Sequence, residues 1–452
     1  MINFYHFTQK NPYMLIHSPK HRLIVLTDIT SLTPTEKEPD DAQSMIRLML
    51  YSNEIEIEGL IASSNLGHGQ ITRPDLIERI VAAYQKVHPN LLIHDPNYPD
   101  AEYLFSRIKD GQPIAGQSIP FEQSIGKNRD TSASNWIIQV IDRPDPRPVW
   151  VAVWGGTADL AQALWRARND RTTKDFNQFL RKIRVHAIAD QDRTAVWIKD
   201  QFPGLFYIRR TYGFRGMYRG GDTYLSSSNW VQKNLKNHGE LGDLYPDYQG
   251  GDIWSKQLGQ VRGIKEGDTP SYLGLIRNGL NPTANPLFGD WGGRCQPHTP
   301  LRYEDAIDPL PSYEVDPAPQ MATVYRWRSA FQADFAARMD WCIYDFGSVS
   351  HSPCIHFLGE ETLQAVPGEK ITVDASPSFD PNGKHLHFSW SFYREASSYP
   401  GYPIIESPTT PITTITIPSS PESGDIHILL TVTNDGDPPL SSYQRLIIRI
   451  CN

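Results

Sequence analysis

Acidic side chains stand where the chain could hold a cation or move a proton. Asp28 ends the apolar run RLIVLTD, and Asp40 with Asp41 opens the segment DDAQSMIRLMLYSNE, whose apolar residues recur at helical spacing. Three converging carboxylates would repel one another unless a proton or a cation lay between them. Hard oxygen donors of this kind suit Ca²⁺ or Mg²⁺. The alternative interpretation is that the acid pair only caps a helix and that Asp28 is a solvated strand end.

Polar clusters follow later apolar runs in the same way. Asn65 comes just after the run IEIEGLIASS, a Gly-Gly turn at residues 155–156 follows PVWVAV, and Asp190 with Asp192 follows IRVHAI. A further acidic segment, EGDTP, which contains Asp268, precedes another helix-like stretch. Because ligands of open parallel sheets bind outside the carboxyl ends of the strands, the pattern predicts that these clusters line one crevice.

A sheet whose strands alternate with helices along the chain would bring these clusters together. Short apolar runs typical of buried parallel strands occur at residues 22–28, 55–64, 148–153 and 183–188. Amphipathic helical segments occur at residues 40–54, 73–87, 157–168, 194–201, 269–278 and 330–340. The segment 206–252 is rich in Gly, Tyr and Asn and is predicted to form loops or a lid. The alternation predicts an α/β fold, a mainly parallel sheet flanked by helices.

The character of the chain changes after about residue 353. Runs such as HFSWSFY, TTITIP, HILLTVT and QRLIIRI are β-branched or alternating, and the turn signals FDPNGK and NDGDPP separate such runs. This pattern predicts an antiparallel β-sandwich. With 452 residues the chain is long enough for two to four folding units. We therefore predict an α/β domain over residues 1–350 and an all-β sandwich domain over residues 351–452.

Composition excludes several classes of function. The 43 basic residues against 51 acidic ones give a net charge of −8, which disfavours binding to nucleic acid or to anionic membranes. No apolar run approaches the roughly 18–20 residues that span a bilayer, and no secretory signal is recognised, so we expect a cytoplasmic protein. The four cysteines have no metal-ligand spacing, which indicates neither a zinc site nor a dense disulfide framework.

The order of these motifs resembles the nucleoside-hydrolase-like family, in the branch described as cellulose-binding, where this domain precedes a β-sandwich. Nucleoside hydrolases begin with a strand, an Asp, a short loop and a paired Asp-Asp that opens a helix. Here LTD ends at Asp28, and EPDD supplies Asp40 and Asp41. The match continues through Asn65, the turn in WGGTADLAQAL, and Asp268 in GDTPSYLGLI. The terminal sandwich resembles Ig-like or PKD-like modules.

The resemblance implies roles for particular residues. It implies one Ca²⁺ ion held by three carboxylates and one backbone carbonyl, those of Asp28, Asp41, Asp268 and Ala158 or its neighbour Thr157. It also implies that Asp28 and Asp40 are the catalytic carboxylates, with Asp28 taking the proton of the attacking water. Asp40 and Asn65 would bind the sugar hydroxyls. A nearby divalent ion lowers the pKa of water, and carboxylates stabilise an oxocarbenium-like transition state.

This chain departs from nucleoside hydrolases at two places. The insertion ITSLTPTEKEP lengthens the step from Asp28 to Asp40, and Gly267 replaces a histidine that often assists the leaving group. Further candidates for contact with the substrate are Asp190, Asp192, His238, Glu266 and Trp291. Their alternative interpretations are a loop hydrogen bond for the histidine, a solvated charge for the glutamate and simple packing for the tryptophan.

The preferred hypothesis is a Ca²⁺-dependent glycosidase-type hydrolase that cleaves a ribosyl N-glycosidic bond or a related glycosidic bond. Its substrate would be a small nucleoside or glycoside. The alternative is a carbohydrate-binding protein that keeps the fold and the metal site but catalyses nothing, in which case a glycan is the partner. Relatives of the fold self-associate, so the resemblance also admits a homo-oligomer.

Overall fold

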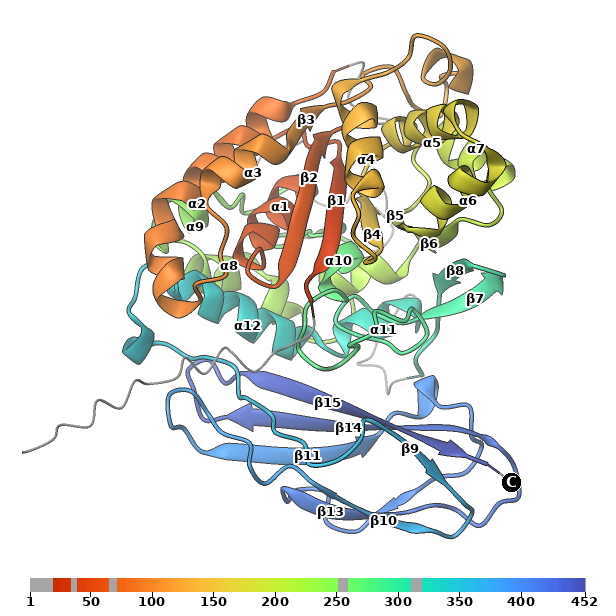
Figure 1. The fold of residues 1–452 in the computed structure, drawn as a ribbon. Helices are drawn as coiled ribbons and strands as arrows, with labels where there is room; N and C mark the ends of the chain where they lie inside the picture. The colour runs from red at the N-terminus through yellow and green to blue at the C-terminus, as the bar shows by residue number, and fades with distance from the viewer. Residues whose placement is uncertain (1–18, 34–38, 65–70, 251–258, 310–318, 452) are drawn as a thin grey trace, which may run out of the picture. The chain divides into compact units, whose positions relative to one another are not determined.

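The computed structural model describes residues 19–33, 39–64, 71–250, 259–309 and 319–451 (Figure 1). The chain forms two compact units. The first, here called the sheet unit, comprises Lys20–Ile276 and Thr283–Val349, and the second, the sandwich unit, contains Ser350–Asn452 with the short segment Arg277–Pro282. Sequence patterns alone place that short segment in the first domain.

An eight-stranded sheet forms the centre of the sheet unit, in the order β3-β2-β1-β4-β5-β6-β8-β7. Its strands in chain order are β1 (His21–Thr27), β2 (Ile55–Ala62), β3 (Ile108–Asp110), β4 (Val149–Val153), β5 (Ile183–Ile188), β6 (Phe206–Arg210), β7 (Cys295–Thr299) and β8 (Arg302–Asp305). Neighbouring strands are parallel except for the antiparallel pair β7 and β8. The predicted α/β fold with a mainly parallel sheet is therefore confirmed.

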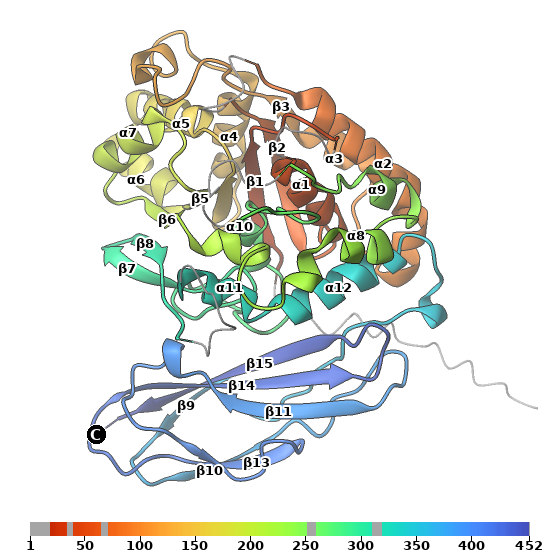
Figure 2. The ribbon, with the colours of Figure 1, turned by 180° about the vertical axis from the view of Figure 1, so that it is seen from behind.

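Helices cover both faces of this sheet (Figures 1 and 2). They are α1 (Asp40–Leu50), α2 (Pro74–His94), α3 (Ala101–Arg107), α4 (Ser132–Asp142), α5 (Ala158–Asp170), α6 (Thr173–Arg181), α7 (Arg193–Gln201), α8 (Ser228–Asn234), α9 (Gly239–Leu244), α10 (Pro270–Leu273), α11 (Ala322–Tyr325) and α12 (Arg328–Asp340). Apolar side chains of α4 and α5 pack with Ile24, Leu26 and Val151 of the sheet in one buried core. The strand order reverses between β1 and β4, so a crevice is expected at their carboxyl ends.

Two local predictions were wrong. The segment 206–252, predicted as loops or a lid with weak periodicity, contains β6, two 3₁₀ turns and the helices α8 and α9. The helix predicted over residues 269–278 is reduced to the single turn α10. At Gly274, which follows α10, a Cβ atom would lie 2.5 Å from the Asp290 carboxylate, so another loop packs closely on this point. Tertiary packing thus overrides the helical spacing of the apolar residues.

The sandwich unit consists of a three-stranded sheet, β10-β13-β12, and a four-stranded sheet, β11-β14-β15-β9. Its strands are β9 (Thr362–Ala365), β10 (Lys370–Asp374), β11 (Leu386–Phe392), β12 (Ile404–Ile405), β13 (Ile412–Thr416), β14 (Gly424–Asn434) and β15 (Ser441–Ile450). The predicted all-β domain is confirmed, but β9 and β15 pair in parallel, so the prediction of a wholly antiparallel sandwich was wrong there. Within this unit the N–H of Tyr443 donates to the Asn278 carbonyl over 2.9 Å, which ties residues 277–282 to β15.

No helix in the described part of the chain is long and apolar enough to cross a membrane.

Candidate active site

Four carboxylates gather where β1 ends and where α1 and α10 begin. Asp28 directly follows β1, Asp40 and Asp41 are the first two residues of α1, and Asp268 stands two residues before α10. Asp40, Asp41 and Asp268 each offer one carboxylate oxygen within 4.8 Å of the other two. Acidic residues in the first turn of α1 are favoured there by the helix dipole. The structure thus brings together segments that are more than 200 residues apart in the sequence.

The carboxylates of this group repel one another. Burial raises the pKa of Asp28 and of Asp268 well above the usual value, and the charges of Asp41 and Asp40 raise both further. The buried Oδ2 atom of Asp268 has no hydrogen-bond partner in the described structure. Lys265, whose Nζ lies 3.8 Å from Asp40 Oδ2, lowers the pKa of Asp268 in part. One ammonium group cannot neutralise four carboxylates, so the site favours a further cation.

The donor set fits a hard divalent ion. Ca²⁺ takes six to eight oxygen ligands, typically carboxylates, carbonyls and water. The cluster supplies carboxylate oxygens, one of which is buried and unpartnered. Asp41 is held in place by a hydrogen bond that Thr27 Oγ1 donates to its Oδ1 atom. The predicted metal residues Asp28, Asp41 and Asp268 therefore lie together, and Asp40 adds a fourth carboxylate.

A Gly-Gly turn after β4 packs against the first carboxylate. A Cβ atom on Gly155 would lie 2.6 Å from Asp28 Cβ, so a side chain there would displace the aspartate. The neighbouring backbone is held by two hydrogen bonds, from Trp154 N–H to the Leu26 carbonyl over 2.8 Å and from Gly156 N–H to the Ser64 carbonyl over 3.1 Å. The glycine turn thus has a definite role, which is to let β4 approach Asp28.

A second link fixes Asp268. The indole N–H of the buried Trp154 donates to Ser271 Oγ over 2.8 Å, and Ser271 Oγ donates to the Asp268 carbonyl over 2.6 Å. This chain of hydrogen bonds connects the end of β4 to the start of α10. It therefore couples the position of Asp268 to the sheet.

Glu266, which was predicted to contact the substrate, is engaged in a buried ion pair. Its fully buried carboxylate lies 2.6 Å from Arg47 Nε and accepts hydrogen bonds from Tyr245 and Thr269. Burial lowers the pKa of Arg47, but the charge of Glu266 and the neighbouring tyrosines together outweigh this, so the guanidinium stays charged. Both oxygens of Glu266 are occupied, and the residue holds α1 against the loop before α10.

Three other predicted substrate contacts are used in packing. Both ring nitrogens of His238 form hydrogen bonds. Nδ1 lies 2.8 Å from the Lys236 carbonyl oxygen, and Nε2 lies 2.9 Å from Asp340 Oδ1 at the end of α12. Trp291 is 1% exposed. Asp192 caps α7 and accepts hydrogen bonds from the N–H and hydroxyl of Thr157. All three side chains are thus engaged in burial or in hydrogen bonds within the protein.

The remaining predicted residues have different outcomes. Ala158 is the buried first residue of α5, and the carbonyl of its neighbour Thr157 accepts the N–H of Ala161 within that helix. Asp190, which precedes α7, is bound to Lys199 in the last turn of that helix and to Tyr207 and Arg209 of β6. Asn65 lies outside the described residues.

Sequence reasoning missed two residues beside the cluster. Lys265 stands three positions before Asp268, and its charge next to acids was the available signal. Phe214 lies in a 3₁₀ turn of the segment that was predicted as loops. A Cβ atom on Gly267 would lie 3.3 Å from the Phe214 ring and 3.7 Å from Asp40 Oδ2. No sequence pattern marks this phenylalanine, because tertiary contact alone brings it to Gly267.

Comparisons with known proteins agree with this architecture. The family model described as "Cellulose-binding Sde182, nucleoside hydrolase-like domain" matches residues 22–295, and "Cellulose-binding protein Sde0182, C-terminal domain" matches residues 370–450. A solved nucleoside hydrolase-related protein from Saccharophagus degradans, described as associated with carbohydrate metabolism, is 31% identical, with a TM-score of 0.79 over 96% of this chain and 100% of that one. No curated protein matches.

A smaller likeness concerns one part of the chain. The PKD domain of the KIAA 1837 protein is 18% identical over 21% of this chain and 83% of that domain, with a TM-score of 0.17. The two family matches cover parts of both units, and the long structural match covers 96% of the chain. The chain belongs to the cellulose-binding Sde182 family, whose first domain is nucleoside hydrolase-like.

Proposed function

We propose that this protein is a Ca²⁺-dependent hydrolase of a glycosidic bond in a nucleoside or another small glycoside. The observation that carries the proposal is the convergence of Asp40, Asp41 and Asp268 beside Asp28, with a buried and unpartnered oxygen on Asp268. Membership of a nucleoside hydrolase-like family supports it. The site also lies where ligands of parallel sheets bind, outside the carboxyl ends of β1 and β4.

Asp28, Asp41 and Asp268 would hold the ion, which when bound lowers the pKa of a water molecule. Asp28 lies at the end of β1 among the other acids, so its carboxylate is placed to accept a proton from an attacking water. Asp40 has the more exposed side chain, at 21%. Its carboxylate can therefore accept hydrogen bonds from sugar hydroxyls and stabilise positive charge that develops on the sugar ring.

The part of the site that would face the leaving group is less polar here than in nucleoside hydrolases, which often carry a histidine at the position of Gly267. Gly267 carries no side chain, and the ring of Phe214 lies next to it. An aromatic face can stack on a base or on the apolar face of a sugar, but it cannot donate a proton. The substrate is therefore a glycoside whose leaving group needs no proton from position 267.

The test is release of free sugar by the full chain from a panel of nucleosides and aryl O-glycosides, with calcium and with a chelator. Sugar release should require calcium and should fall at least about 100-fold in Asp41→Asn, the scale seen when one electrostatic group of an active site is removed. Glu78→Gln, on the exposed face of α2, is the matched control and should keep full activity. Full activity of Asp41→Asn in the chelator would overturn the proposal.

The second candidate is a carbohydrate-binding protein without turnover. Two observations favour it: the family description names cellulose binding, and neither Gly267 nor the buried Glu266 can act as a general acid beside Asp268. Retention of the full chain on cellulose, together with no sugar release from the panel in calcium, is the expected result for this candidate. Calcium-dependent release of sugar excludes it.

A further inference from the structure

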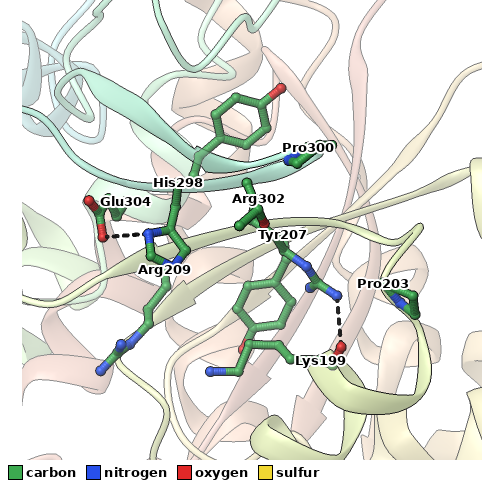
Figure 3. A pocket seen from close by; sticks show the side chains of 10 residues that line it. Lys199, Pro203, Tyr207, Arg209, His298, Pro300, Arg302 and Glu304 are labelled. Atoms are coloured by element: carbon green, nitrogen blue, oxygen red, sulfur yellow. Dashed lines mark hydrogen bonds and ion pairs between the residues drawn. The ribbon is translucent and has the colours of Figure 1, made fainter.

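A cavity, here called the edge cavity, lies where β6, β7 and β8 meet the end of α7 (Figure 3). Its volume is about 520 Å³, within the roughly 300–1,000 Å³ of small-molecule sites. None of the residues that line it belongs to the carboxylate cluster of Asp28, Asp40, Asp41 and Asp268. The edge cavity is therefore a separate feature of the sheet unit.

The strand register explains why polar side chains share this cavity. β6 and β8 run parallel, with Tyr207 opposite Arg302 and Arg209 opposite Glu304. Residues two apart on a strand point to the same face, so these four side chains lie on one side of the sheet edge. Lys199, near the end of α7, and Pro203 complete that side.

Positive charge is in excess on the cavity wall. Asp190 Oδ2 serves two cations at once, Lys199 Nζ and Arg209 Nε, the latter at 3.1 Å. Its other oxygen accepts a hydrogen bond from Tyr207 Oη over 2.8 Å. A single carboxylate cannot neutralise both cations, and Arg302 adds a third. Glu304, the acid that lines the cavity, does not remove this excess, because three cations still face the two carboxylates of Asp190 and Glu304.

That second acid already has partners of its own. The Glu304 carboxylate lies 3.6 Å from His298 Nδ1, and it accepts a hydrogen bond from Gln296 over 3.1 Å. In Figure 3 the His298–Glu304 pair lies to one side, away from the guanidinium of Arg302. It therefore does not serve as the counter-charge of Arg302.

The guanidinium of Arg302 is fixed in place by its neighbours. Its Nη2 atom donates to the carbonyls of Lys199 and Phe202, over 3.2 and 2.7 Å. Its guanidinium lies 5.5 Å from the centre of the Tyr207 ring. The buried Nη1 atom has no hydrogen-bond partner in the described structure. The guanidinium is thus held beside the cavity, and its charge acts on an anion there through space.

We propose that the edge cavity binds a small organic anion, a sugar-sized ring that carries a carboxylate or a phosphate. Arg302, Lys199 and Arg209 attract the charged group, and the exposed ring of Pro203 contacts the apolar face of the body. The proposal does not depend on the carboxylate cluster or on its chemistry. It adds a binding site for an acidic ligand to a chain whose net charge is negative.

The test is titration calorimetry on the full chain, in a chelator, with glucuronate, glucose 6-phosphate and glucose as probes. At least one of the two anions should bind at least about 10-fold more tightly than glucose, and the affinity should fall with added salt. Which anion binds identifies the charged group. Arg302→Gln and Arg209→Gln should each weaken binding about 10-fold or more, because each removes a positive charge beside the bound anion. Arg209 is 49% exposed, so its variant is expected to fold even if Arg302→Gln does not.

Two controls separate this site from the rest of the molecule. Lys86→Gln removes an exposed cation on α2, and Asp41→Asn alters the carboxylate cluster; both should bind the anion as the unmodified chain does. Equal affinity for glucose and both anions, or no binding of either anion, would overturn the proposal. The proposal would also be overturned if Asp41→Asn lost anion binding while Arg209→Gln kept it in full.

Discussion

Gly155 and Asp28 are in direct contact across the sheet, since a Cβ atom on the glycine would lie 2.6 Å from the Cβ of the aspartate. We predict that Gly155→Ala displaces Asp28, lowers the calcium affinity of the site about 10-fold or more, and destabilises the protein by about 1–3 kcal/mol, the cost of overpacking. Calcium titration and thermal unfolding measure both effects.

Gly204 provides the matched control for that substitution. No atom lies within 4 Å of a Cβ placed there, so Gly204→Ala should leave calcium affinity and the melting temperature unchanged. If Gly155→Ala bound calcium as tightly as Gly204→Ala, the glycine turn would have no role in positioning Asp28.

Asp268→Asn should change stability in opposite directions with and without calcium. In a chelator the variant should melt at a higher temperature, because it removes one of four mutually repelling carboxylates. With calcium the order should reverse, because a ligand present at 100 times its Kd stabilises the unmodified protein by about 2.7 kcal/mol and the variant would lose this gain. Differential scanning calorimetry in the two buffers gives both comparisons. An equal calcium-induced shift in the two proteins would show that Asp268 binds no ion.

Glu266→Gln should damage folding rather than substrate binding. The substitution leaves Arg47 buried without its counter-charge, and breaking one side of a buried pair costs about 3–5 kcal/mol. Denaturant unfolding should show this loss, while Glu78→Gln on the surface of α2 should show almost none. A raised KM with an unchanged unfolding midpoint would instead restore Glu266 to the substrate site.

His238→Gln should reduce stability in a pH-dependent way. Burial opposes the charge of His238, but the hydrogen bond and charge of Asp340 together with hydrogen bonds to backbone carbonyls outweigh it and raise the pKa above the ordinary value. The charged pair therefore contributes stability that is complete below about pH 6.5, the unfolded pKa, and is lost as the pH rises through the folded pKa. A hydrogen bond to a charged group is worth about 1.5–3 kcal/mol, so we expect a loss of about that size at pH 5.5 and little loss at pH 9.

Unfolding curves at the two pH values check this prediction, and Asp340→Asn should reproduce the same dependence because it removes the other half of the pair. A loss that is equal at both pH values, or a loss of sugar release with unchanged stability, would contradict the structural role of His238.

The sequence by itself determined the classes of structure. Apolar runs and the 3.6-residue spacing of apolar side chains depend only on neighbours along the chain. The strand-like run that ends at Asp28, the helical spacing that begins at Asp40 and the later repeats of this alternation therefore predicted strands, helices and a parallel sheet. The positions of the acids at the ends of successive strands also indicated which residues would meet, because the carboxyl ends of parallel strands share one edge of the sheet. The structure confirmed the fold and brought Asp268 to the other acids.

Only the tertiary structure decided which polar residues are free to act. Glu266 and Asp190 look alike in the sequence, since both are acids near the end of an element. In the structure Glu266 forms a buried ion pair with Arg47, whereas Asp190 forms an ion pair with Arg209 beside the edge cavity. Phe214 reaches Gly267 across more than 50 residues of chain. Partners of this kind are set by packing between distant segments, and burial changes the cost of a charge far more than local sequence does. The sequence therefore indicated where chemistry could occur, and the packing selected the side chains that remain available for it.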